Sequence, residues 1–211
     1  MNKKIVIVDY GMGNLHTLKR ILNQYSFPVV VSKNIKDILS ASHLILPGVG
    51  HFGRAMAQLK EYDLIEHLNH MALVEKKPVL GICLGMQLMT AHSEEGDCEG
   101  LGWFPCHTSK LRVENDKLFK VPHLGWNTLN IKKPHVVFSD FNRESRMYFV
   151  HGYGVMEANP EHELCTTHYG GAFVSGICKE NVIGLQFHPE KSHEMGQTII
   201  SNFVNKCIAP E

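Results

Sequence analysis

The chain has 211 residues, of which 44% are hydrophobic and 20% charged, and its 21 Lys and Arg residues balance 21 Asp and Glu residues. This composition is typical of a soluble globular protein, so we treat residues 1–211 as a single domain with one sizeable core. The neutral balance gives no electrostatic basis for binding nucleic acid or an anionic membrane, and no apolar stretch is long enough to span a bilayer.

The beginning of the chain predicts a buried strand rather than a secretory signal. Two lysines precede an apolar run, but this run stops at Asp9 after four residues, which is too short for a signal peptide. The six cysteines are scattered and form no CxxC pair, so we expect neither a disulfide framework nor a zinc site, even with His188 and His193 nearby in sequence. A cytoplasmic location would keep a functional thiol reduced.

In the first half of the chain, short apolar runs alternate with stretches of helical periodicity. Strands are predicted at residues 5–10, 29–32, 44–46 and 79–82. Helices are predicted over residues 15–25 and 53–73, and from residue 85 to 91. This alternation predicts an α/β fold in which a mostly parallel central sheet has helices on both faces.

The second half predicts a small antiparallel extension of the same domain. Shorter, more alternating strands are expected at residues 135–138, 147–153, 164–168, 173–178 and 183–187. No linker or low-complexity segment separates the halves. A last amphipathic helix is expected over residues 192–207, with its inward face formed by Met195, Ile199, Phe203 and Val204.

The candidate nucleophile is Cys83, which follows an apolar run and has a glycine two residues away on each side. Gly81 and Gly85 would let two backbone segments pass closely in a sharp strand-to-helix turn. Such a turn exposes the sulfur, and the helix start behind it favours a thiolate. The alternative is an ordinary core cysteine, which behaves as a small hydrophobe.

A candidate base lies far downstream in the triplet His188-Pro189-Glu190. In an extended segment residues two apart point to the same side, so Glu190 could steady the His188 ring. The alternative is a surface polar pair that closes a strand.

Two glycine-containing loops also follow predicted strands. In the loop of residues 47–50, backbone N–H groups of Val49 and Gly50 could join that of Leu84 in stabilising an oxyanion, although a plain turn is the alternative. Residues 9–14 begin like a dinucleotide fingerprint, but His16 stands where its third glycine belongs, which favours a structural or interface turn. The aromatic segments at 121–127 and 148–153 fit either a core or a docking surface.

Together these segments resemble the class I (triad) glutamine amidotransferases, and they are most similar to the glutaminase subunits of imidazole glycerol phosphate synthase, from histidine biosynthesis. The resemblance covers nearly the whole chain and lies in residues 9–15, 46–53, 81–88, 122–127, 148–153 and 186–192. It implies a flavodoxin-like α/β fold and a glutaminase activity without a cofactor or a metal.

The resemblance assigns a role to each part of the site. Cys83 would attack the side-chain amide of glutamine, His188 would act as base and then as acid, and Glu190 would orient His188. Ammonia would leave, and water would hydrolyse the glutamyl thioester to glutamate. The oxyanion donors would be Val49, Gly50 and Leu84. The glutamine contacts would fall on Gly50, Gln87, Glu95, Gly152 and Tyr153.

The resemblance also implies a partner. Ammonia would pass to a separate (β/α)₈ synthase subunit that makes imidazole glycerol phosphate and AICAR, and the two chains would form a heterodimer. In this family the loop at 47–50 is thought to have the wrong conformation for oxyanion binding until the partner binds. We therefore expect weak glutaminase activity from this chain without its partner. The docking face would include Asn14, Trp126, Tyr148 and Lys191.

The sequence is also compatible with two other classes of function and with a different acceptor for the ammonia. Gly152 stands where the family usually has Ser or Thr, and residues 191–196 differ from its commonest form. Both features resemble paralogues that supply ammonia for amidation of a surface-polysaccharide sugar. A cysteine peptidase or esterase is a second class, but many such hydrolases place the acid before the histidine, whereas Glu190 follows His188. A non-catalytic module would be expected to lack a triad member, and none is missing.

Overall fold

The computed structural model describes residues 3–207. Residues 1–2 and 208–211, the ends of the predicted domain, lie outside the described residues. The central sheet is parallel where five strands run in the order β2-β1-β3-β4-β14. These strands are β1 (Ile5–Val8), β2 (Val29–Ser32), β3 (His43–Gly48), β4 (Val79–Cys83) and β14 (Val182–Leu185). The predicted parallel sheet is confirmed. The strand expected at residues 183–187 is predicted as part of the antiparallel extension, but β14 pairs parallel with β4 and is thus the last parallel strand of the central sheet.

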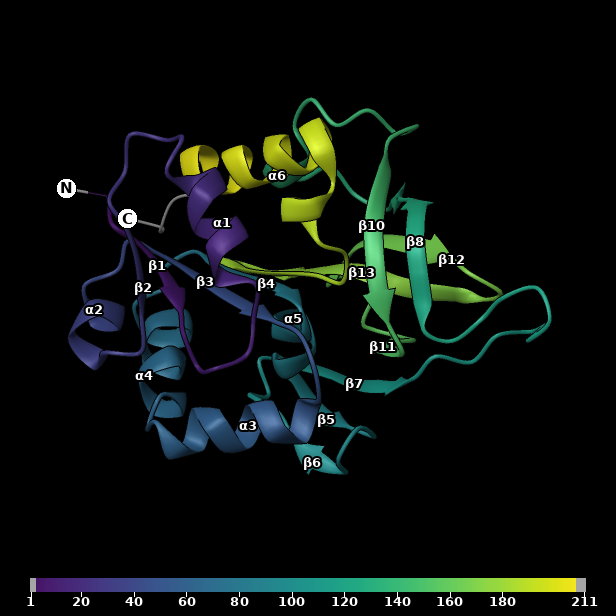
Figure 1. The fold of residues 1–211 in the computed structure, drawn as a ribbon, viewed down its shortest axis with the longest axis horizontal. Coiled ribbons are helices and arrows are strands. Elements are labelled where there is room, and N and C mark those ends of the chain that lie inside the picture. The colour runs from purple at the N-terminus through teal and green to yellow at the C-terminus, as the bar shows by residue number, and fades with distance from the viewer. Residues whose placement is uncertain (1–2, 208–211) are drawn as a thin grey trace.

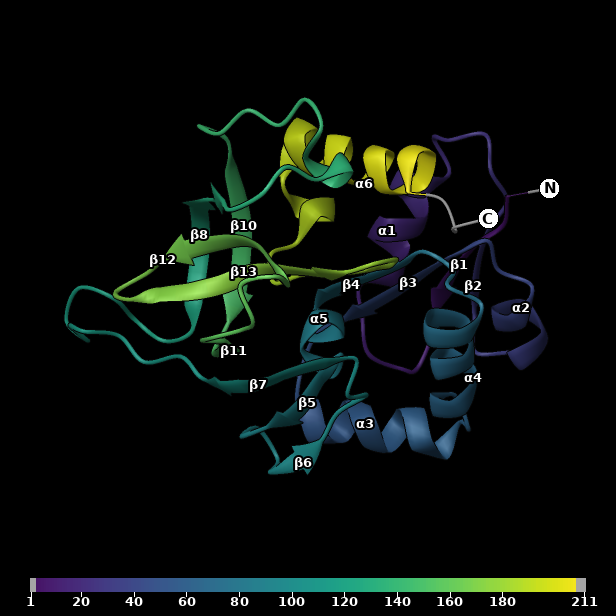
Figure 2. The same ribbon diagram turned by 180° about the vertical axis from the view of Figure 1, so that it is seen from behind.

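Helices cover both faces of this sheet, as predicted (Figure 1). One face carries α1 (Leu15–Leu22) and α6 (His193–Lys206). The other carries α2 (Ile35–Leu39), α3 (Phe52–Glu61), α4 (Ile65–Asn69) and α5 (Leu84–Leu88). The view from behind shows the same two helical layers on either side of the strands (Figure 2).

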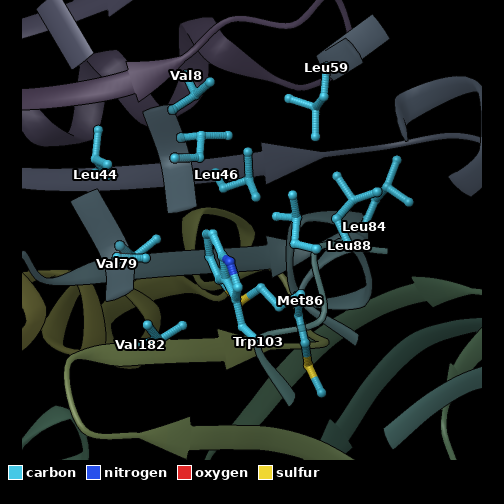
Figure 3. Packing of buried hydrophobic residues seen from close by; sticks show 14 of the residues in the cluster. Val8, Leu44, Leu46, Leu59, Val79, Leu84, Met86, Leu88, Trp103 and Val182 are labelled. Carbon is cyan, nitrogen blue, oxygen red and sulfur yellow. The ribbon is translucent and has the colours of Figure 1, made fainter. Parts of the chain in front are cut away.

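Strand β1 is apolar at every position because both of its faces are buried. Ile5 and Ile7 belong to the core cluster beneath α1 and α6, whereas Val6 and Val8 belong to the cluster on the opposite face. Figure 3 shows the second cluster, in which side chains from the strands gather with those of α3 and α5. Each fully buried aliphatic side chain of this kind contributes roughly 1.5–3 kcal/mol.

The second half forms the predicted antiparallel extension, apart from one parallel pairing between residues 90–93 and residues 104–110. Strand β13 (Ala172–Lys179) pairs antiparallel with β14, and the sheet then continues in the order β13-β11-β7-β5-β6. These strands are β11 (Tyr153–Val155), β7 (Phe104–Lys110), β5 (Thr90–Ser93) and β6 (Cys98–Glu99), with β12 (Glu163–His168) and β9 (Asn130–Ile131) beside β13. Strands β8 (His123–Thr128) and β10 (Arg146–His151) form a separate antiparallel ribbon.

The prediction of one helix over residues 53–73 is wrong. The structure has α3, then α4, and then a π-helical turn at His70–Val74. Asp63 adopts a φ of +55°, in the left-handed region, and its backbone N–H bonds to Lys60 O instead of continuing the α-helix. This break turns the chain so that Leu64 is fully buried.

Several further boundaries differ from the predictions. The strand expected over 5–10 ends at Val8, and the helix expected over 15–25 ends at Leu22. The helix expected over 85–91 ends at Leu88, because Thr90 already belongs to β5. Residues 135–138 are not a strand, since Val136–Phe138 is a 3-10 helix capped by the His135 side chain. The strand expected over 147–153 divides at Gly152 into β10 and β11, which belong to different sheets. No helix within residues 3–207 is long and apolar enough to cross a membrane.

Candidate active site

The carboxyl ends of adjacent parallel strands bring the predicted site residues to one edge of the sheet. Gly48 pairs with Cys83 across β3 and β4, so the loop carrying Val49 and Gly50 begins beside the sulfur-bearing residue. Leu185 pairs with Ile82 across β14 and β4, which places the segment leading to His188 on the other side of Cys83. Ligand sites of open α/β sheets lie at this edge.

Cys83 occupies the predicted sharp turn between β4 and α5. Its φ of +54° and ψ of −109° lie outside the regions that residues other than glycine favour, so the backbone is strained at the candidate nucleophile. A Cβ at Gly85 would lie 1.7 Å from the carbonyl oxygen of Leu46. A Cβ at Gly81 would lie 2.8 Å from the Gly85 backbone. The predicted close passage of backbone segments at both glycines is confirmed.

His188 and Glu190 form a buried pair. The Nδ1 atom of His188 lies 2.8 Å from Oε1 of Glu190, and each side chain is 2% exposed, which contradicts a surface polar pair. The two residues are not in one extended segment, because Pro189–Lys191 forms the 3-10 helix η3. His188 itself is extended, with φ of −100° and ψ of 92°, and the turn after it brings the carboxylate to the ring.

The charges around His188 favour its protonated form. Burial by itself would lower the pKa, but the neighbouring Cys83 and the hydrogen-bonded Glu190 outweigh burial and raise the pKa of His188 to about 9. Among residues 3–207, no group forms a hydrogen bond with Nε2 of His188, although this atom is buried. Since Nδ1 is held by Glu190, Nε2 is the ring atom left to exchange a proton with the neighbouring sulfur.

A pocket of about 500 Å³ opens beside Cys83. Every residue predicted as an oxyanion donor or a glutamine contact lines it, and its volume is typical of small-molecule sites. The pocket is lined by Val49, Gly50, Cys83, Leu84, Gln87, Glu95, Pro122, Val150, His151, Gly152, Tyr153 and Lys191.

Hydrogen bonds hold two of these side chains in place. Gln87 donates from Nε2 to Tyr153 O at 2.8 Å, while Oε2 of Glu95 accepts from the backbone N–H of Phe52 at 2.8 Å, at the start of α3. Gly50 has a φ of +113°, which favours glycine, so the loop conformation beside Cys83 depends on it.

The loop after β1 is a structural turn. Asp9 accepts from the backbone N–H of Gly11 at 3.1 Å, and the hydroxyl of Tyr10 donates to Pro47 O at 2.5 Å. These contacts tie residues 9–14 to the loop of residues 47–50, which supports the interpretation as a tight turn over that of a dinucleotide site.

The structure brings together three of the four predicted docking residues. Trp126 pairs with Tyr148 across β8 and β10, their rings lie 5.5 Å apart, and Nζ of Lys191 lies 5.6 Å from the Tyr148 ring centroid. Trp126 is 41% exposed and stacks on His193 at 4.6 Å. Asn14 lies at the start of α1, on the loop after β1.

Sequence reasoning missed Gln186, which contacts the candidate nucleophile directly. The Nε2 atom of Gln186 donates to Sγ of Cys83 at 3.6 Å, and the side chain is completely buried. Its position two residues before His188 was a usable signal, because alternate residues of an extended segment point to the same side.

Comparison with known proteins supports the resemblance. A model of the family "Glutamine amidotransferase class-I" matches residues 6–207. The chain is 42% identical to "Imidazole glycerol phosphate synthase subunit HisH 2" of Methanococcus maripaludis over 203 residues, covering 96% of this chain and 100% of that protein. It is 39% identical to the protein of the same name from Pseudomonas aeruginosa, with 95% and 98% covered.

Solved structures share the fold at lower sequence identity. A Thermoplasma acidophilum protein named as a GMP synthase subunit matches with a TM-score of 0.73 at 19% identity, covering 98% of this chain and 94% of that one. The structure of PurLQS from Thermotoga maritima matches with a TM-score of 0.73 at 18% identity, with 97% and 99% covered. These matches agree with the observed α/β architecture.

Proposed function

Because this chain belongs to the class I glutamine amidotransferases, we propose that it hydrolyses glutamine through Cys83 and delivers the ammonia to a partner protein. The observation that carries the proposal is the position of Cys83. Its backbone is strained in the sharp turn between β4 and α5, and it lies next to the buried pair of His188 and Glu190. A nucleophile, a base and an orienting carboxylate in contact are the parts that acyl transfer requires.

The proposed reaction begins with a proton on His188 and a thiolate on Cys83. The sulfur attacks the side-chain carbonyl carbon of glutamine, and the negative oxygen is met by backbone N–H groups of Leu84 and of the loop containing Val49 and Gly50. His188 then gives its proton to the amide nitrogen, which leaves as ammonia. In the second half His188 takes a proton from water, which attacks the thioester and releases glutamate. Glu190 holds the ring throughout.

The side chains of Gln87 and Glu95 and the backbone of Gly152 and Tyr153 are the proposed contacts that hold glutamine. Gly152 also leaves room for the Cβ of the family's usual Ser or Thr, because a Cβ there would meet nothing closer than Val121 Cγ1 at 3.8 Å. The departure from the family pattern therefore concerns a lost hydroxyl and not a change in the shape of the backbone.

We further propose that the partner is a (β/α)₈ synthase subunit in a cytoplasmic heterodimer, producing imidazole glycerol phosphate and AICAR. The names of the relatives support this proposal. The exposed Trp126, with the half-buried Tyr148 and Lys191 beside it, also supports it, since aromatic side chains are enriched at interfaces. A partner that amidates a surface-polysaccharide sugar is the alternative. Co-purification from the native source identifies the partner and decides between these acceptors.

The activity is tested by measuring glutamate release from glutamine, with and without the co-purified partner. We expect Cys83→Ala to lower the rate at least about 10³-fold and Cys98→Ala to leave it unchanged, since only the first removes the proposed nucleophile. The partner is expected to raise the wild-type rate. Full activity in Cys83→Ala, or cleavage of peptides or esters but not glutamine, would overturn the proposal.

A further inference from the structure

The carboxamide of Gln186 joins the candidate nucleophile to a side chain of the pocket wall. Its Nε2 donates to Sγ of Cys83 at 3.6 Å, and its Oε1 accepts from Nε2 of Gln87 at 3.0 Å. Gln186 is 0% exposed and lies on the stretch between β14 and His188. It therefore contacts two functional elements without facing the pocket itself.

Neighbouring groups determine which end of Gln186 faces the sulfur. The carbonyl oxygen of Tyr153 can only accept, so Gln87 must present its NH₂ group there, at 2.8 Å. The second hydrogen of this NH₂ group goes to Gln186, whose oxygen must then be the acceptor. The NH₂ group of Gln186 is consequently turned to Cys83.

Two buried histidines extend the same network. Tyr153 O also accepts from Nδ1 of His151 at 2.8 Å, which leaves Nε2 of His151 to accept from Nδ1 of His123 at 3.3 Å. Burial lowers the pKa of His151 to about 4 and that of His123 to about 3, so both rings are neutral near pH 7. A neutral imidazole has one donor and one acceptor, and the direction of every hydrogen bond is thereby set.

We propose that Gln186 is a positioning residue whose N–H group orients the sulfur of Cys83 and whose oxygen orders Gln87. A donor aimed at the sulfur stabilises the thiolate relative to the thiol, because hydrogen bonding to a charged form favours that form. With both hydrogens of its NH₂ group engaged, Gln87 has its own oxygen left to meet a donor on a ligand. The role in glutamine hydrolysis rests on the proposed function, whereas the contact with the sulfur does not.

Other titratable groups also surround Cys83 and stay in place when Gln186 is changed. His188 follows β14, Tyr10 follows β1 and interacts with Cys83, and Lys191 and Glu95 line the same pocket. Their effects are common to the wild type and to both variants of Gln186, so a difference between the wild type and these variants reports the lost donor.

The test measures how fast iodoacetamide alkylates Cys83 between pH 5 and 10, followed on the Cys83 peptide by mass spectrometry. Gln186→Met keeps the length of the side chain but removes the donor. We expect the midpoint of its rate profile to rise by about one pH unit and the rate at pH 7 to fall about tenfold. The double variant Gln87→Leu/Gln186→Met removes both partners of their hydrogen bond, so neither is left buried without a partner and the fold is less disturbed. We expect the same shift of the midpoint in this variant.

Asn202→Leu is the matched control, because the buried Asn202 carboxamide donates to Val137 O and Ser139 O on the α6 side of the sheet. We expect its alkylation profile to match the wild type. Wild-type profiles in both Gln186 variants, or an equal shift in Asn202→Leu, would overturn the positioning role. Alkylation needs no glutamine turnover, so this result stands apart from a failure of the proposed function.

Discussion

Replacing Glu190 with glutamine removes a buried negative charge while keeping an oxygen that can accept from the His188 ring. The wild-type pair is 2.8 Å apart and shielded from water, since both side chains are 2% exposed. The substitution therefore changes the charge beside His188 with little change in shape, and its cost depends on whether the ring carries a proton.

The expected cost follows from the pKa of His188. Burial lowers this pKa, but Cys83 and Glu190 outweigh burial and raise it from 6.5 to about 9. Because each tenfold gain in proton affinity is worth about 1.4 kcal/mol, the raised pKa stabilises the folded state by about 3 kcal/mol. This contribution is fully present below pH 6.5 and is lost as the pH rises through 9. Glu190 shares it with Cys83, so we expect Glu190→Gln to cost about 1–2 kcal/mol at pH 6.

Urea unfolding at pH 6 and at about pH 9.5 measures this cost. We expect the loss in Glu190→Gln to vanish or reverse at the higher pH, where the ring is neutral beside a buried carboxylate. Glu180→Gln is the control, since Glu180 is 61% exposed and its ion pair with Lys76 is worth less than about 1 kcal/mol at either pH. An equal loss at both pH values in Glu190→Gln would refute the reasoning.

The remaining predictions concern the turn and the docking face. Gly85→Ala is expected to abolish soluble folding because its Cβ would lie 1.7 Å from Leu46 O, whereas Gly152→Ala, whose nearest contact is at 3.8 Å, is expected to stay within about 1 kcal/mol of the wild type in urea unfolding. A stable Gly85→Ala protein would contradict the described packing. Trp126→Ala is expected to weaken binding of the co-purified partner at least about tenfold by calorimetry, while the exposed control Leu118→Ala leaves it unchanged. Equal effects of both would place the docking face elsewhere.

The parallel half of the fold was predictable because both of its faces are buried. Strands such as β1 read as continuous apolar runs, and the amphipathic stretches between them can only be crossover helices. The turn at Cys83 was also predictable, because Gly81 and Gly85 stand where only glycine fits. Local sequence therefore carried the position of the candidate nucleophile.

Features decided by tertiary contacts were not predictable. Residues 136–138, Val-Val-Phe, favour a strand by propensity, but the His135 cap and packing against α6 make them a 3-10 helix. The helix over 53–73 looks periodic throughout, yet the chain turns at Asp63 to bury Leu64. The contact between Gln186 and Cys83 joins residues 103 positions apart, so the local pattern could place Gln186 on the same side as His188 but could not identify Cys83 as its partner.

Covalent capture of Cys83 tests the central claim most directly. The protein, with its co-purified partner, is treated with an electrophilic glutamine analogue and with the analogue that is one methylene shorter, and every cysteine peptide is examined by mass spectrometry. We expect one adduct, which forms on Cys83 with the glutamine-sized reagent only. We expect His188→Asn to slow its formation strongly. An unmodified Cys83, or equal labelling of Cys83 by both reagents, would contradict it.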